Sequence, residues 1–466
     1  MQTKLSTSEK LGYSLGDAAA NLVWRGALAF LAVFYTDTFG LETMAVAALL
    51  LIVRLSDGVT DIIVGMIADR TESRWGKFRP WVLFSAPVLG IFMVLTFTTP
   101  DLSPTAKLVY AYVTYIGLTL AYTMNNVPYS ALMGVMTPSN KERTILSSWR
   151  FAAAFMGGFL VMVGTPVLVD YLGGGNEQLG YQYTMYVFAV LLVILLIITF
   201  YTTKERVQPP QDDTLSETNW GSFALNMLLA SIPLVSMTVF FYYRNIPTGI
   251  IFALVLLITY YFVSKLINKP QDQTSSAEKD IIDLLTNKPW LILLCIGFLF
   301  MMFNGIKIGA AAYYFRHYVS DDISITQLIS WWPTDLINIQ GKEAFLSVYF
   351  AAFMPILFFA MLGDCADYSE WKNNRRATGL VFSAGTFINK TGGGFAGALI
   401  VIVLGAYGYV GTDESTIHMA LPALKSLMSW IPAIFALVAA ILFMAYPLSE
   451  DKMNQIEGEM KVRRGL

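Results

Sequence analysis

Twelve apolar segments of about 20 residues each constrain the fold of this sequence more than any other feature. An α-helix rises about 1.5 Å per residue, so about 20 apolar residues cross the roughly 30 Å hydrocarbon layer of a membrane. A single segment in lipid satisfies its backbone hydrogen bonds only as a helix. The sequence therefore predicts an all-α membrane protein with transmembrane helices near residues 13–37, 43–68, 81–99, 108–135, 148–169, 183–202, 221–242, 246–267, 289–317, 345–363, 378–408 and 424–446.

Composition agrees with a membrane location and excludes several classes of function. Hydrophobic residues make up 55% of the chain, charged residues only 14%, and the mean hydropathy is +0.55. Soluble domains carry about a quarter charged residues. The net charge of -2 gives no basis for binding nucleic acid. No P-loop, HExxH or GxSxG motif is present, so neither an ATP-driven pump nor another enzyme is predicted, and no cofactor is expected.

The distribution of Lys and Arg predicts the orientation in the membrane, because cytoplasmic loops carry an excess of these residues. We expect a multi-pass protein of the cell (inner) membrane with both termini in the cytoplasm, and we expect a monomer. The positive charges occur in alternate loops and in the tail, as Arg70, Arg74, Lys77 and Arg79, then Lys141 and Arg143, then Lys204 and Arg206, then Lys372, Arg375 and Arg376, and finally Lys461, Arg463 and Arg464.

A polar stretch near the middle of the chain predicts the boundary between two halves. We expect an amino-terminal six-helix half at 1–202 and a cytoplasmic linker at 203–220. An atypical hydrophobic hairpin follows at 221–267, and the remainder of the carboxy-terminal half occupies 268–466.

The second predicted helix contains two carboxylates within the apolar stretch LIVRLSDGVTDIIVG. Charges at this depth are costly, so each is a candidate for function. Asp57 and Asp61 are four residues apart and share one helix face, with Thr60 on the neighbouring flank. Their oxygens suit a small hard cation or a bound proton. The alternative is a structural salt-bridge network in which Arg54 neutralises Asp57, but one arginine does not balance two acids.

The first and fourth predicted helices carry polar residues that suit a water-filled pathway. Asp17, Asn21 and Arg25 follow at four-residue steps and so share one face of the first helix. The fourth helix places amides, hydroxyls and tyrosines around a proline, where they could bind sugar hydroxyls or a cation. Polar packing between helices is the alternative for both. The fourth-helix residues are Tyr122, Thr123, Asn125, Asn126, Tyr129 and Ser130.

Two further cations lie in apolar segments. Arg150 opens the fifth helix, and Lys390 lies near the middle of its span, where it needs an acidic partner or an anionic ligand. With Arg25 and the neutral Asn21 and Asn126, they favour an anionic sugar such as a uronide. Pairing of these cations with the protein's own acids is the alternative.

Several motifs resemble a known transporter family. GMIADR at 65–70 and RWGKFRPW at 74–81 are similar to the loop signature of the major facilitator superfamily. The chain further resembles the glycoside–pentoside–hexuronide:cation symporters of that superfamily. The motifs that carry this resemblance are YSLGDAAANL at 13–22, YTDTFGL at 35–41, LSDGVTD at 55–61, YTMNNVPYSAL at 122–132 and DCADYSEWKNNRRATG at 364–379.

The resemblance implies a two-half helical bundle with a central sugar site and a nearby cation site, working by alternating access. Asp57 and Asp61 match the family's cation-binding acids, and Thr123 matches a cation-ligating hydroxyl. Thr60 stands where sodium-using members have Asn, so the choice between proton and sodium stays open. Asn21 and Asn126 stand where members have sugar-binding aspartates, so galactoside recognition is not implied.

Tyr122, Arg150 and Lys390 remain as sugar contacts that the resemblance allows. The resemblance thus predicts a cation-coupled saccharide symporter, with an uncoupled facilitator and a non-transporting sensor as alternatives. The second half departs from the family. Relatives have two further helices between the segment that ends near Tyr318 and the DYSEW segment, whereas this chain has only the span at 345–363 there, and the hairpin at 221–267 is extra. We expect this hairpin to occupy the place of the missing pair, and a peripheral position is the alternative.

Overall fold

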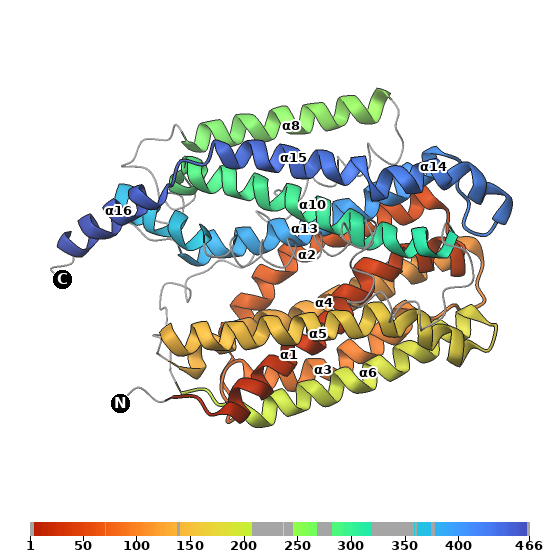
Figure 1. The fold of residues 1–466 in the computed structure, drawn as a ribbon, viewed down its shortest axis with the longest axis horizontal. Coiled ribbons are helices and arrows are strands. Elements are labelled where there is room, and N and C mark those ends of the chain that lie inside the picture. The colour runs from red at the N-terminus through yellow and green to blue at the C-terminus, as the bar shows by residue number, and fades with distance from the viewer. Residues whose placement is uncertain are drawn as a thin grey trace, which may run out of the picture. The chain divides into compact units, whose positions relative to one another are not determined.

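The computed structural model describes residues 4–69, 71–137, 140–206, 236, 246–267, 282–317, 358, 361–373 and 378–463. All regular elements in these ranges are helical, which confirms the predicted all-α architecture. The elements are α1 (Thr7–Val33), the π-helical turn η1 (Phe34–Thr38), α2 (Thr43–Asp69), α3 (Arg79–Thr96), α4 (Pro104–Met136), α5 (Asn140–Gly173), α6 (Glu177–Thr202), α8 (Ile246–Ile267), α10 (Lys288–His317), α13 (Thr378–Ala406), the 3₁₀ turn η4 (Glu414–Thr416), α14 (Ile417–Met428), α15 (Trp430–Met444) and α16 (Glu450–Arg463) (Figure 1).

Seven described helices, counting η1 with α1 and α14 with α15, are long and apolar enough to cross a membrane. Helices occupy ten of the twelve predicted segments. The other two, 221–242 and 345–363, fall almost entirely outside the described residues. The first part of α2, Thr43–Arg54, is apolar by composition, and the helix continues without a break through Asp57 and Asp61 to Asp69.

The chain divides into two compact units, which are described separately. Unit 1 is Met1–Ser231 with Val401–Ala420, and unit 2 is Ile232–Ile400 with Leu421–Leu466. The predicted first half ends at residue 202, where α6 also ends. The domain division and the position of the hairpin stay predictions, because most of the linker and the first part of the hairpin lie outside the described residues.

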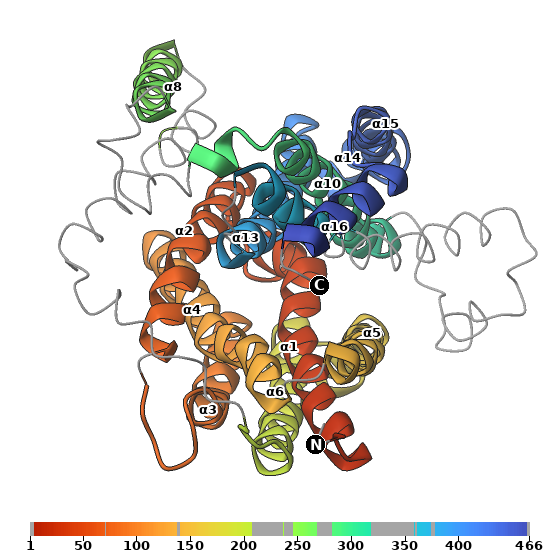
Figure 2. The ribbon, with the colours of Figure 1, turned by 90° about the vertical axis from the view of Figure 1, so that its left-hand side faces the viewer.

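Unit 1 is built around α1, which packs against α5 and α6, while α3 packs on α4 and α6, and α2 packs on α4. Figure 2, which looks nearly along the helices, shows α1 with α4, α5 and α6 around it. Ser6 begins α1 with a capping box, because its side chain accepts a hydrogen bond from the Glu9 backbone and the Glu9 side chain accepts one from Ser6. Most of α1 is buried as a result of its central place.

Small residues and paired tyrosines bring the helices of unit 1 close together. A Cβ atom at Gly157 of α5 would lie 2.4 Å from the carbonyl oxygen of Ala18, so only glycine allows this approach of α5 to α1. Tyr13 and Tyr129 are fully buried, stack at 4.7 Å, and each hydroxyl donates to the other residue's backbone carbonyl. These reciprocal bonds fix α1 against α4 beside the polar face of α1.

The end of unit 1 near the amino terminus is held by charged groups. The Glu205 carboxylate, just after α6, accepts the backbone N–H groups of Lys77, Phe78 and Arg79 at the start of α3. An anion at a helix amino terminus is stabilised by these free N–H groups. Lys10 Nζ lies 2.8 Å from Glu142, and this bond holds the pKa of Glu142 below its ordinary value.

In unit 2, α10 packs against α15, and glycines of the KTGGG run let α13 approach α10. A Cβ atom at Gly392 would lie 2.7 Å from Met301 Cβ. A buried apolar cluster joins the start of α10 to the helical stretch 361–373 and to α13 through Leu284, Trp290, Leu293, Phe358, Leu362, Cys365, Ala366 and Val381. The described residues of α8 are exposed or half-buried.

Candidate functional site

Two carboxylates of α2 and one hydroxyl of α4 form a compact polar cluster inside unit 1. Asp57 and Thr123 are 1% and 0% exposed, and Asp61 is half-buried. The Thr123 hydroxyl oxygen lies 2.8 Å from Asp57 Oδ1 and 2.9 Å from Asp61 Oδ1. The four-residue spacing that predicted a shared face for the two acids therefore places both within reach of one group on a neighbouring helix.

One hydroxyl hydrogen lies between two carboxylates in this cluster. A threonine hydroxyl has a single hydrogen, which Thr123 donates to one carboxylate or shares between both. An added proton or positive ion would offset the charge of two ionised acids held this close together. Asp57, Asp61 and Thr123, which we name the carboxylate cluster, thus have the chemistry of a site for one cation or proton.

Arg54 lies beside the carboxylate cluster and forms a long ion pair with Asp57. Its Nη1 is 3.9 Å from Asp57 Oδ2, which is longer than a hydrogen bond. The guanidinium also lies over the Trp24 ring, with 4.2 Å from Cζ to the ring centroid, and is 5.8 Å from the Tyr115 ring. The structure therefore contains the Arg54–Asp57 pair of the salt-bridge alternative, at a distance beyond a hydrogen bond.

The Thr60 hydroxyl donates to the backbone carbonyl of Asp57 at 2.9 Å. Its hydrogen is therefore engaged within its own helix turn, and only its oxygen lone pairs remain for a cation. The assignment of Thr60 as a ligand stays a prediction.

A second charged group in unit 1 is fully paired. Arg150 Nε of α5 lies 2.5 Å from Asp17 Oδ2 of α1, and Arg150 Nη2 lies 3.4 Å from Oδ1. The guanidinium also lies 5.6 Å and 5.1 Å from the ring centroids of Tyr13 and Tyr129. The structure thus shows the pairing that the sequence left open as an alternative for Arg150, and this arginine is not an isolated positive charge.

The remaining predicted sugar residues of unit 1 lie on α1 and α4. Asn21, Arg25, Tyr122 and Asn126 are all half-buried. The Asn21 amide donates to the Asp17 backbone carbonyl at 2.9 Å. Arg25 has no carboxylate within ion-pair distance among the described residues, and its stem packs against α5 where a Cβ at Gly158 would lie 3.2 Å away.

Lys390 lies on α13 in unit 2 and is 5% exposed, like its neighbour Thr391. The sequence predicted that a lysine at this depth needs a partner, and Lys390 does take part in an interaction. Its assignment to the sugar site stays a prediction.

Trp24 is the residue of this region that the sequence reasoning missed. Its indole lies under Arg54 and stacks on Tyr122, with 5.9 Å between ring centroids and 28° between planes. The spacing of Asp17, Asn21 and Trp24, at i, i+4 and i+7, places all three on one broad helix face, and this signal could have found it.

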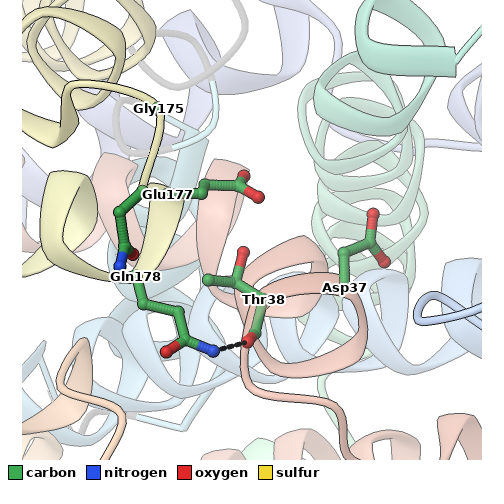
Figure 3. A pocket seen from close by; sticks show the side chains of 6 residues that line it. Asp37, Thr38, Gly175, Glu177 and Gln178 are labelled. Carbon is green, nitrogen blue, oxygen red and sulfur yellow. Dashed lines mark hydrogen bonds between the residues drawn. The ribbon is translucent and has the colours of Figure 1, made fainter.

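A separate pocket of about 430 Å³ lies just beyond the carboxy-terminal end of α1, between η1 and the start of α6 (Figure 3). Gln178 donates to the Thr38 carbonyl at 3.2 Å across it. Twenty residues of helix separate Asp37 from Asp17, which corresponds to about 30 Å. We therefore do not take this pocket as the predicted sugar site. Its lining residues are Asp37, Thr38, Gly175, Asn176, Glu177 and Gln178.

Comparison with solved structures gives the fold of the chain. A bacterial homologue of the human drug peptide transporters aligns with a TM-score of 0.57 at 13% identity, over 95% of this chain and 98% of that chain. At this identity the likeness shows the fold alone. The chain has the fold of a polytopic helical transporter.

Sequence comparison then gives the family. The profile described as MFS/sugar transport protein matches residues 12–263 and 343–450. The inner membrane symporter YicJ of Escherichia coli (strain K12) is 34% identical, over 95% of this chain and 92% of the relative. The isoprimeverose transporter of Lactiplantibacillus pentosus is 30% identical, over 97% of this chain and 90% of the relative. The chain belongs to the MFS/sugar transport family, which confirms the resemblance drawn from its motifs.

Proposed function

We propose that the protein is a secondary transporter that couples uptake of a saccharide to the flow of a proton or a sodium ion. The carboxylate cluster carries this proposal, because one threonine hydrogen serves two carboxylate contacts of 2.8 Å and 2.9 Å. An added cation or proton completes the cluster. A buried site that gains and loses one positive charge is what coupling to an ion gradient requires.

The polar face of α1 and α4 supplies the saccharide site in this proposal. Asn21, Tyr122 and Asn126 offer amide and hydroxyl groups that exchange hydrogen bonds with sugar hydroxyls. The names of the relatives support a saccharide substrate and symport at an inner membrane. We infer the same location, with both termini in the cytoplasm, transport without catalysis, and a monomer.

An anionic sugar is the finer form of the proposal, and it depends on Arg25 and Lys390. Arg150 is matched by Asp17, so it adds little net positive charge. Arg25 lies half-buried on the polar face of α1 and suits a sugar carboxylate.

The test is uptake into proteoliposomes under an imposed sodium or proton gradient, with methyl β-D-glucoside, methyl β-D-xyloside and methyl β-D-glucuronide as solutes. Accumulation above equilibrium that is lost in Asp57→Asn/Asp61→Asn would support symport and show which ion is used. Uptake that only equilibrates under both gradients would indicate a facilitator. Binding without counterflow would indicate a sensor.

Arg25→Ala tests whether the substrate is an anionic sugar or a neutral one. If Arg25 binds a carboxylate, the variant loses about tenfold or more of its methyl β-D-glucuronide uptake, as expected for a lost charge-assisted hydrogen bond. Methyl β-D-glucoside uptake serves as the control and stays close to that of the unmodified protein. Unchanged glucuronide uptake would contradict binding of the sugar carboxylate by Arg25.

A further inference from the structure

The carboxylate cluster and the residues predicted to bind sugar are connected by one indole. Trp24 of α1 interacts with the Arg54 guanidinium of α2, at 4.2 Å from Cζ to the ring centroid, and stacks on the Tyr122 ring of α4, at 5.9 Å between ring centroids. Three helices of unit 1 therefore meet at this side chain. Tyr122 directly precedes Thr123, whose hydroxyl touches both carboxylates.

Arg54 interacts with the aromatic rings of Trp24 and Tyr115 and with the Asp57 carboxylate, and these attractions differ in origin. Its guanidinium is attracted to the face of the indole by the charge distribution of the ring. It is also attracted to the Asp57 carboxylate, which lies 3.9 Å from Nη1, outside hydrogen-bond range. Since Arg54 is 5% exposed, water screens neither attraction strongly. The position of the guanidinium therefore depends on the charge that Asp57 presents.

A cation in the carboxylate cluster changes this balance. It offsets the negative charge of Asp57 and weakens the attraction of that acid for Arg54. Weaker attraction to Asp57 would leave the guanidinium more fully on the indole, which stacks on Tyr122. Departure of the cation would restore the attraction of Asp57 for Arg54 and reduce this support of the indole.

Trp24 and Tyr122 are both half-buried, whereas Leu22 and Val23, the chain neighbours of Trp24, are 1% and 5% exposed. Trp24 and Tyr122 therefore keep part of their surface outside the packed interior of unit 1. In the proposed function Tyr122 contacts the sugar, so the position of the indole bears on that contact.

We propose that Trp24 is a positioning residue that couples occupancy of the carboxylate cluster to the affinity of the sugar site. This inference rests on the proposed function and adds a residue that carries the coupling. Coupling between two ligands is measured as the factor by which one changes the affinity of the other, and roughly 5- to 150-fold is typical. Trp24 raises this factor without binding the cation.

The experiment measures sugar affinity with and without the coupling cation in purified protein. Methyl β-D-glucoside and methyl β-D-glucuronide are titrated by calorimetry at zero and saturating sodium, and at high and low pH. Trp24→Leu removes the aromatic face, and Trp24→Phe keeps one. Tyr181→Leu is the matched control, because it breaks a stacked pair of similar geometry with Phe97, 6.0 Å and 16°, elsewhere in unit 1.

We expect Trp24→Leu to lower the coupling factor by about fivefold or to unity, and Trp24→Phe and Tyr181→Leu to keep at least half of it. Thermal unfolding and gel filtration show whether each variant is folded. An unaltered coupling factor in folded Trp24→Leu would overturn the inference and leave the proposed function standing. So would an equal loss of sugar affinity with and without cation, which indicates a simple contact. Sugar affinity of the unmodified protein that is independent of both cations would overturn the inference and the proposed coupling together.

Discussion

Unit 1 contains two groups of charged residues that are paired in different ways. In the carboxylate cluster, Asp57 and Asp61 share the Thr123 hydroxyl, and Arg54 lies 3.9 Å from Asp57. Between α1 and α5, one acid and one base form a short pair, Asp17 with Arg150. Under the proposed function, the first group takes up an added positive charge, whereas the second is a closed ion pair that holds α1 against α5.

Asp61→Asn should give the largest effect on transport, because it removes one of the two carboxylates that contact Thr123. The cluster then has one ionised ligand fewer for the added cation. We expect gradient-driven accumulation to fall by at least about 100-fold, in line with the loss of a charged group at a buried site. Equilibrating counterflow should persist. Accumulation at the level of the unmodified protein would contradict the proposal that this cluster binds the coupling cation.

Asp17→Asn tests the other group, and its effect should appear in stability. The side chains of Arg150 and Asp17 are 19% and 14% exposed, so the variant leaves a poorly solvated guanidinium unpaired. Breaking such a pair costs about 3–5 kcal/mol. Thermal unfolding in detergent should show this loss, and Asp17→Asn/Arg150→Gln should recover more than half of it. If the double variant is no more stable than Asp17→Asn, Asp17 and Arg150 do not act as a closed pair, and the contrast with the carboxylate cluster is wrong.

Thr123→Val gives the smallest of the three effects, because it keeps the shape and both acids but removes the shared hydrogen. The cation concentration for half-maximal uptake should rise about tenfold, the order expected for one hydrogen bond to a charged group. Thr123→Ser, which retains a hydroxyl, should stay within about threefold of the unmodified protein on the same grounds. Equal behaviour of the valine and serine variants would show that the hydroxyl is not part of the cation site.

Much of this site was predictable along single helices. The four-residue spacing in LSDGVTD placed Asp57 and Asp61 on one face, and YSLGDAAANLVWR placed Asp17, Asn21 and Arg25 on another. Thr123 was one of several polar residues of α4 from the sequence alone. Its role as a cation ligand was predicted only through the family resemblance, since nothing in the spacing of α4 indicates which of these residues faces α2. The distance between its hydroxyl and both acids, 2.8 Å and 2.9 Å, came from the structure.

The sequence by itself determined the membrane location, the helices and the residues that share a helix face, because the backbone fixes rise and rotation per residue. Tertiary structure decided which faces meet. The Asp17–Arg150 pair joins residues 133 positions apart, and the contact of Arg54 with Trp24 depends on how α1 and α2 are rotated and how deeply they pack. Rotation and depth follow from the fit of side chains between helices, such as Gly157 against Ala18, and no periodicity within one helix contains that information.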